Sequence, residues 1–277
     1  MSEPDDILPA PSGGPIGPAR VLERAELADA IDLVLWIGQL LLEHGAHASQ
    51  VEQTIVHVGA ALGCDKLDVL VSPNALVVTT TEGEDFRTKI RRITRLHVDL
   101  TAVVAVNDAA RATLTGELDR VALRERLGAI ARARPAYPRW LVVAMVGLGC
   151  AAFARLFGGE LLACAATFVA AAIGLVVRQE LTRRKVNAVL VVVLTAFVAG
   201  TTSAGLLRLM PGAHARDAIV ASVLLLVPGV SLINAVDDLA RGHGVIAMTR
   251  GFHGLVISLA IAVGLLLGLA LVGSPAL

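Results

Sequence analysis

Five apolar runs in the second half of the sequence limit what this chain can fold into. They cover about residues 140–157, 161–177, 187–207, 217–236 and 252–272. A helix of about 20 residues crosses the hydrocarbon core of a bilayer, which is about 30 Å thick, and about 17 residues is the lower limit. Three runs reach that length comfortably; the first two are short, with Gly158 and Gly159 between them. We therefore expect five transmembrane helices, the first two forming a hairpin.

The charged residues divide the chain in the same place. Residues 1–139 carry 34 of the 48 charges. Over the whole chain 55% of residues are hydrophobic and the mean hydropathy is +0.71, values too high for a soluble protein. Five prolines and no basic or apolar leader precede residue 20, so we expect a disordered tail and no secretory signal. The predicted organisation is a tail at 1–24, an α+β domain at 25–136 and a five-helix transmembrane domain at 137–277.

The positions of Lys and Arg predict how the helices are oriented. Nine basic residues lie at one set of helix ends and three at the other; the nine are Arg132, Arg134, Arg139, Arg178, Arg183, Arg184, Lys185, Arg241 and Arg250. Basic residues are enriched in the cytoplasmic loops of membrane proteins. We therefore expect an α-helical integral membrane protein of the cytoplasmic (inner) membrane, with its N-terminal α+β domain in the cytoplasm and its C-terminus outside.

Periodicity predicts the elements of the N-terminal domain. Apolar residues recur at helical spacing over residues 25–43 and 48–62, and Gly45 and Gly63 are suited to the helix ends. Three β-branched runs, at 66–72, 75–81 and 86–92, indicate a small antiparallel meander. Two further helices, at about 96–114 and 119–133, complete an α+β domain.

Several functions find little support in the sequence. The two halves carry net charges of −4 and +4 without a basic run, so no nucleic-acid partner is expected. Three scattered cysteines form neither a disulfide framework nor a metal knuckle. Glu43 and His47 lie one helical turn apart and, with His44, could be metal ligands. No cysteine and no further ligand at a suitable spacing accompanies them, so no metal is expected. Without a nucleotide-binding or nucleophile motif, we predict no enzyme and no cofactor.

The most informative segment is the proline-glycine pair at Pro228 and Gly229 in the fourth apolar run. Pro228 lies 11 residues after Asp217 in the sequence, hence about 16 Å deep and near the middle of the bilayer. Proline removes a backbone hydrogen bond, so we expect the helix to break or kink there. If it breaks, a second helix starts near Val230 with free N–H groups that suit an anionic substrate. A structural kink without a ligand is the alternative.

Polar residues follow this break. Ser231, Asn234 and Asp238 share one helical face, with Asp237 beside it. We predict that Ser231 and Asn234 bind substrate with Pro228 and Gly229, and that Asp237 or Asp238 exchanges protons. Solvated carboxylates near the membrane surface are an equally good interpretation of the two aspartates. Arg178 and Arg250 could pair with a substrate carboxylate or with Asp237, although positive-inside anchoring explains both equally well.

Short segments of the chain resemble the threonine/serine exporter family. In the membrane half they are YPRWLV at 137–142, MVGL at 145–148, RQ at 178–179, ASVLLLVPG at 221–229, LIN at 232–234 and GH at 242–243. In the N-terminal half they are LLEHGA at 41–46, ALG at 61–63 and NA at 74–75. The resemblance covers nearly everything after about residue 25, and it is greatest to the longer subunit of the family's two-component form.

The resemblance implies proton-driven efflux of a small carboxylate, either a succinate-like dicarboxylate or threonine and serine. It also implies a shorter, all-membrane partner subunit of the same family. Small residues on the predicted helices agree with packing against further helices, from a partner or from copies of this chain. Two other functions remain open: a membrane-tethered metabolite sensor, and a hydrolase using the His and Glu residues of the first helix pair.

Overall fold

The computed structural model of the chain describes residues 24–64, 66–82, 85–93, 98–133, 137–209 and 215–273. Apart from Arg24, the tail expected at residues 1–24 lies outside the described residues. The described residues form two compact units. The first unit comprises residues up to 134 together with 230–251, and the second comprises 135–229 together with 252–277.

The N-terminal part of the first unit has the expected α+β order. Its elements are α1 (Arg24–Glu43), α2 (Ala48–Ala61), β1 (Lys66–Val71), β2 (Ala75–Glu82), β3 (Asp85–Arg92), α3 (Leu100–Leu114) and α4 (Arg120–Arg132). The strands form an antiparallel sheet in the order β1-β2-β3, as the meander pattern predicts. Asp99 and Asp119 accept hydrogen bonds from the first turns of α3 and α4, which explains where these helices begin.

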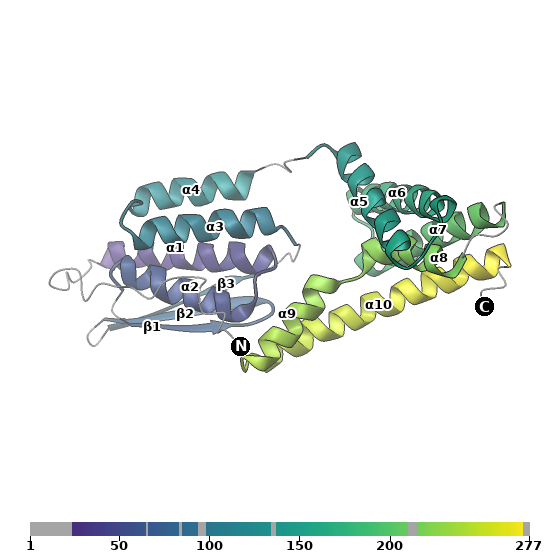
Figure 1. The fold of residues 1–277 in the computed structure, drawn as a ribbon. Helices are drawn as coiled ribbons and strands as arrows, with labels where there is room; N and C mark the ends of the chain where they lie inside the picture. Colours follow the sequence, from purple (N-terminus) through teal and green to yellow (C-terminus); the bar gives the residue numbers. More distant parts are fainter. Residues whose placement is uncertain are drawn as a thin grey trace. The chain divides into compact units, whose positions relative to one another are not determined.

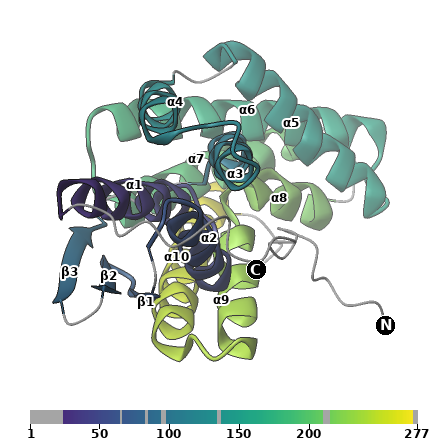
Figure 2. The ribbon, with the colours of Figure 1, turned by 90° about the vertical axis from the view of Figure 1, so that its left-hand side faces the viewer.

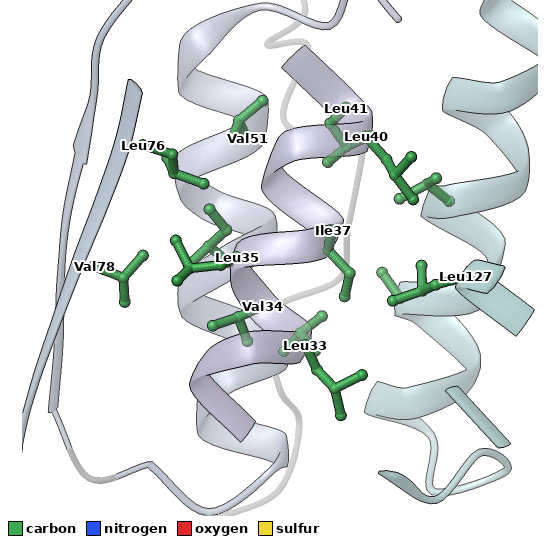
Figure 3. Close-up of a cluster of buried hydrophobic side chains, with 14 of the residues drawn as sticks. Leu33, Val34, Leu35, Ile37, Leu40, Leu41, Val51, Leu76, Val78 and Leu127 are labelled. Carbon is green, nitrogen blue, oxygen red and sulfur yellow. The ribbon is translucent and has the colours of Figure 1, made fainter. Parts of the chain in front are cut away.

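Helices α1 and α2 lie between the sheet and the pair α3 and α4 (Figures 1 and 2). Helix α1 is apolar around much of its circumference, with Leu33, Val34, Leu35 and Ile37 all buried. A helix that is hydrophobic on most sides has to be covered on most sides. Figure 3 shows these residues of α1 between Leu76 and Val78 of the sheet and Leu127 of α4. The core of this unit therefore consists of large aliphatic side chains.

The second unit contains the apolar helices. They are α5 (Arg139–Leu156), α6 (Leu161–Arg183), α7 (Ala188–Arg208), α8 (Ala215–Val223) and the larger part of α10 (Gly244–Val272). Among the described residues, four helices are long and apolar enough to cross a membrane. A fifth span is added if α8 and α9 (Gly229–Ala240) are counted as one interrupted span. The chain is thus a multi-pass membrane protein with four or five spans.

The fourth apolar run is interrupted, as the proline-glycine pair predicts. Helix α8 ends at Val223, and a 3₁₀ turn, η1 (Leu224–Leu226), follows it. Val227 is extended, with φ −59° and ψ 124°, and α9 begins at Gly229, one residue from the predicted start. The residues after the break do not belong to the second unit, because Val230–Gly251 pack with the N-terminal elements.

Helix α10 begins eight residues before the apolar run that marked it in the sequence. It spans 29 residues, Gly244–Val272. At a rise of about 1.5 Å per residue, that is about 43 Å, whereas the hydrocarbon core of a bilayer is about 30 Å thick. Its first two turns contain Thr249 and Arg250, which is why the apolar run stops short of them. These turns belong to the first unit and the rest of the helix to the second.

Candidate functional site

The backbone around the break explains where Arg178 lies. Pro228 has no N–H to donate to the Leu224 carbonyl, and the N–H of Val227 donates to it instead, at 3.1 Å. The N–H of Gly229, which would bond the Leu225 carbonyl in a continuous helix, donates to Val227 O at 2.9 Å. The Leu225 carbonyl therefore needs another donor. Arg178 Nη1, from α6, supplies it at 3.3 Å.

This contact leaves most of the Arg178 guanidinium available. The group has five N–H donors in a planar fork that matches a carboxylate, and one of them contacts Leu225 O. No other partner of Arg178 occurs in the described parts of the chain. A half-buried charge in a membrane helix is costly, and such charges commonly mark a substrate or ion pathway. The break thus combines a cation with unused donors and a helix terminus, α9, that begins directly after it.

Three other predicted site residues meet in the first unit, where they form a group that we call the clasp. The clasp consists of Asn234, Asp238 and Arg250 with the backbone of residues 45–48. Asn234 Nδ2 donates to Gly45 O at 2.7 Å, and Arg250 Nη2 donates to Ala46 O at 2.7 Å. Asp238 Oδ1 accepts from Ala48 N at 2.8 Å, and its Oδ2 accepts from Arg250 Nη1 at 2.7 Å. The clasp therefore joins α9 and α10 to the loop between α1 and α2.

Asp238 acts as the missing cap of α2. The residue at the N-cap position, His47, makes no side-chain capping bond. Helix N-termini carry unpaired N–H groups and a partial positive charge, so a carboxylate stabilises them. Asp238 supplies that carboxylate from a position 190 residues away. Its side chain is 0% exposed and that of Arg250 13%, so the pair is a buried ion pair with its hydrogen bonds made.

The structure does not bring the remaining predicted residues into the clasp. Asp237, next to Asp238, faces outward and accepts from Arg241 Nε through both oxygens, at 3.1 Å each. The two aspartates are therefore in different environments, one partly exposed and one buried. Ser231 is half-buried, and no described residue forms a hydrogen bond with its hydroxyl. Pro228 and Gly229 lie at the break itself.

The prediction that Arg250 could pair with Asp237 was wrong, because Arg250 pairs with Asp238. Sequence reasoning missed the other partners of the clasp because they are backbone groups. A pattern of side chains cannot identify Gly45 O, Ala46 O or Ala48 N as hydrogen-bonding partners. One signal was available: α2 begins after His47 without Ser, Thr, Asp or Asn at the N-cap, so its N–H groups needed an acceptor from elsewhere. The start of α10, which positions Arg250, was missed too, because it precedes the apolar run.

The candidate metal ligands have other partners. Glu43 accepts from Gln39 Nε2 at 3.0 Å, and His44 Nδ1 lies 2.7 Å from Leu40 O. Among the described residues there is no group of three His, Cys, Asp or Glu side chains placed to hold a metal ion. His47 is half-buried, and burial lowers its pKa below the usual 6.5, although Asp237 and Asp238 oppose that shift.

An interrupted apolar span with a half-buried arginine at the break is typical of membrane proteins that move solutes. Comparison with known proteins agrees with this class. A family model described as "Putative threonine/serine exporter" matches residues 32–272, and the chain belongs to this family of transporters.

Two relatives are similar over almost their whole length. The chain is 34% identical over 252 residues to the "Probable succinate transporter subunit YjjP" of Klebsiella aerogenes, covering 91% of this chain and 97% of the relative. It is 35% identical over 242 residues to the protein of the same name from Escherichia coli K12, covering 87% and 94%. No solved structure matches the chain. The homologues are thus named as components of a transporter.

Proposed function

We propose that this chain is one subunit of a secondary exporter that moves small carboxylates out of the cell. The substrate is a succinate-like dicarboxylate, with threonine or serine as the alternative. The proton-motive force drives the export of this substrate. A shorter, all-membrane subunit of the same family completes the transporter. The family match and the names of the relatives support this proposal. The excess of Lys and Arg at one set of helix ends supports an N-terminus in the cytoplasm and a C-terminus outside.

The observation that carries the proposal is Arg178 at the broken span. Its guanidinium contacts a carbonyl that exists as a free acceptor because Pro228 interrupts the helix. The remaining N–H donors can bind a substrate carboxylate through two parallel hydrogen bonds. Gly229 starts α9 directly after the break and adds the positive end of a helix. We assign substrate recognition to Arg178 and to the break at Pro228 and Gly229, and Ser231 stays a predicted contact.

The clasp suggests a different role for Asn234 and Arg250. Both side chains donate to backbone carbonyls of the α1–α2 loop, so they could contact a substrate only after leaving the clasp. We therefore assign them to holding α9 and α10 against this loop. Asp238 is the better of the two proton-coupling candidates, because a proton on it would weaken its bond to Arg250 and its cap on α2. Asp237 has only an exposed partner on its own helix.

The test is counterflow of labelled succinate, threonine and serine in vesicles containing the full chain with the shorter subunit. We expect Arg178→Gln to lower the rate at least tenfold, since a charged hydrogen bond contributes about 1.5–3 kcal/mol. Arg184→Gln is the matched control, because Arg184 follows the same helix and makes an exposed pair with Glu180. It should transport normally.

Normal counterflow by Arg178→Gln, at equal amounts of inserted protein, would refute the assignment of substrate recognition. Counterflow of none of the three substrates by the unaltered pair of subunits would refute the exporter proposal itself. The proton assignment has its own readout: Asp238→Asn should abolish the pH dependence of transport, whereas Asp237→Asn should leave it intact.

A further inference from the structure

A second polar site, built from other residues than those at the broken span, lies in the first unit. It is an open pocket of about 490 Å³ between α2 and the turn that joins α9 to α10. Helix α2 contributes Ser49, Glu52, Gln53 and His57, and the turn contributes Arg241 and His243. Pockets for small molecules have volumes of about 300–1,000 Å³, so the size suits a small metabolite.

Several polar groups in this pocket have no hydrogen-bond partner among the described residues. Arg241 uses Nε on Asp237, and its two Nη groups have no partner among the described residues. His57 Nδ1 is buried without a hydrogen-bond partner in the part of the chain that the structure describes. Gln53 and Ser49 add an amide and a hydroxyl, and neither has a described side-chain partner. The pocket therefore offers several groups, the two Nη groups of Arg241 foremost, that can donate hydrogen bonds to the oxygens of a ligand.

The free donors of Arg241 favour a ligand that carries a carboxylate. The one carboxylate that lines the pocket, Glu52, already faces His243, with Oε2 3.6 Å from Nε2. Arg241 shares its charge with Asp237 through Nε, but its two Nη groups remain for a ligand, and guanidinium binds carboxylate through planar, paired hydrogen bonds. An imidazole, an amide and a hydroxyl can satisfy the other oxygens of the same ligand.

We propose that this pocket binds a small carboxylate anion and that binding strengthens the clasp. The two walls of the pocket, α2 and the α9–α10 turn, are also the elements that Asp238 joins through Ala48. A ligand that bridges both walls binds better when the clasp is closed, and by linkage it must favour the closed clasp to the same extent. The pocket is thus a regulatory site for an organic acid, separate from the substrate contacts at the broken span.

The test uses the full chain, purified in detergent, and titration calorimetry with succinate. We expect saturable binding that Arg241→Gln weakens at least tenfold and His57→Phe weakens several-fold. Arg124→Gln is the matched control, because Arg124 makes a similar partly exposed ion pair, with Asp29, in the same unit and does not line the pocket. It should bind succinate normally. The uncharged dimethyl ester of succinate should bind at least tenfold more weakly than succinate.

Several results would overturn this proposal. The unaltered chain could fail to bind succinate or threonine saturably, the dimethyl ester could bind as tightly as succinate, or Arg241→Gln could bind succinate as tightly as the unaltered chain. Saturable binding of threonine but not of succinate would support a site for a carboxylate and would show that the ligand is an amino acid. Amide hydrogen exchange reports the clasp: succinate should slow exchange of the Ala48 N–H, and an unchanged rate with bound ligand would refute the coupling. The titrations are repeated in an Arg178→Gln background, so that binding at the broken span does not contribute; because none of them requires transport, they stand apart from the counterflow test.

Discussion

The two units of this chain bury different kinds of side chain. The largest fully buried residues all belong to the first unit, among them Ile31, Leu33, Leu41 and Leu76. In the second unit, the residues with almost no exposed surface are mostly alanines; they include Ala163, Ala166, Ala170, Ala171, Ala196, Ala199 and Ala218. In water, burying a large aliphatic group is favourable by about 1.5–3 kcal/mol, which explains the first core.

Lipid removes that driving force, because a leucine side chain is as well solvated by acyl chains as by another helix. Membrane helices therefore associate where small residues allow backbones to approach. Helices α7 and α10 show this contact: a Cβ on Gly264 would lie 2.3 Å from Val193 O, and one on Gly268 would lie 2.9 Å from Phe197 O. Large residues such as Leu148 and Leu266 instead have about half of their surface exposed. The same aliphatic residue type is a core residue in one unit and a lipid-facing residue in the other.

The largest effect should come from the buried charge that holds α9 in the first unit. Asp238→Ala leaves Arg250 buried without its partner and leaves Ala48 N–H without an acceptor, so we expect the first unit to lose about 3–5 kcal/mol of unfolding free energy. Asp237→Ala removes a partly exposed pair on the same helix and should cost at most about 1 kcal/mol. Trp36 fluorescence during denaturant unfolding measures both in a Trp140→Phe background, since the chain has two tryptophans. Equal losses would show that the clasp does not stabilise the unit.

The second prediction compares the same type of substitution, leucine to alanine, at one position in each unit. Leu41→Ala removes a fully buried side chain from α1 and should destabilise the first unit by about 3 kcal/mol, within the range for buried leucines (Figure 3). Leu148→Ala, on α5, truncates a side chain that is about half exposed and should change stability by less than about 1 kcal/mol. The measurement is thermal unfolding of the full chain in lipid nanodiscs, with Trp36 fluorescence and the α-helical circular dichroism signal followed together. A large loss from Leu148→Ala would contradict the comparison.

The third prediction adds one methyl group to a membrane helix. Gly264→Ala places a Cβ against the α7 backbone, which cannot move aside as a side chain can, so we expect a loss of about 1–3 kcal/mol. Gly149→Ala is its control, because a Cβ at Gly149 meets nothing within 4 Å. The fraction of protein that stays monodisperse after heating in detergent measures the difference. Identical heat resistance of the two variants would mean that α7 and α10 do not depend on close approach.

Much of this fold could be predicted from the sequence because its signals are local. Gly45, Gly63 and Gly116 end helices with φ of +99°, +93° and +77°, and Pro228 interrupts its helix as proline must. The meander follows from alternating β-branched residues. What the sequence could not show is long-range: that α9 joins the N-terminal elements depends on backbone groups at 45–48, which carry no signature of their own. The same limit applies to Arg241 and His57, which are far apart in the sequence and line one pocket.

The smallest expected effect concerns pH and the half-buried His47. Burial lowers the pKa of His47 below 6.5, against the opposing charges of Asp237 and Asp238 and with a smaller contribution from Arg241 and Arg250. The unfolded chain therefore binds this proton at a higher pH than the folded chain does. The stability that comes from keeping His47 neutral is fully present above about pH 6.5 and is lost as the pH falls through the lowered pKa.

His47→Gln cannot take up the proton, so its thermal midpoint should fall less between pH 7.5 and pH 5.5 than that of the unaltered chain. Other acidic and basic groups titrate alike in both proteins, and the difference between the two pH profiles isolates His47. Parallel profiles would show that His47 keeps its ordinary pKa, and that the clasp beside it tolerates a second positive charge.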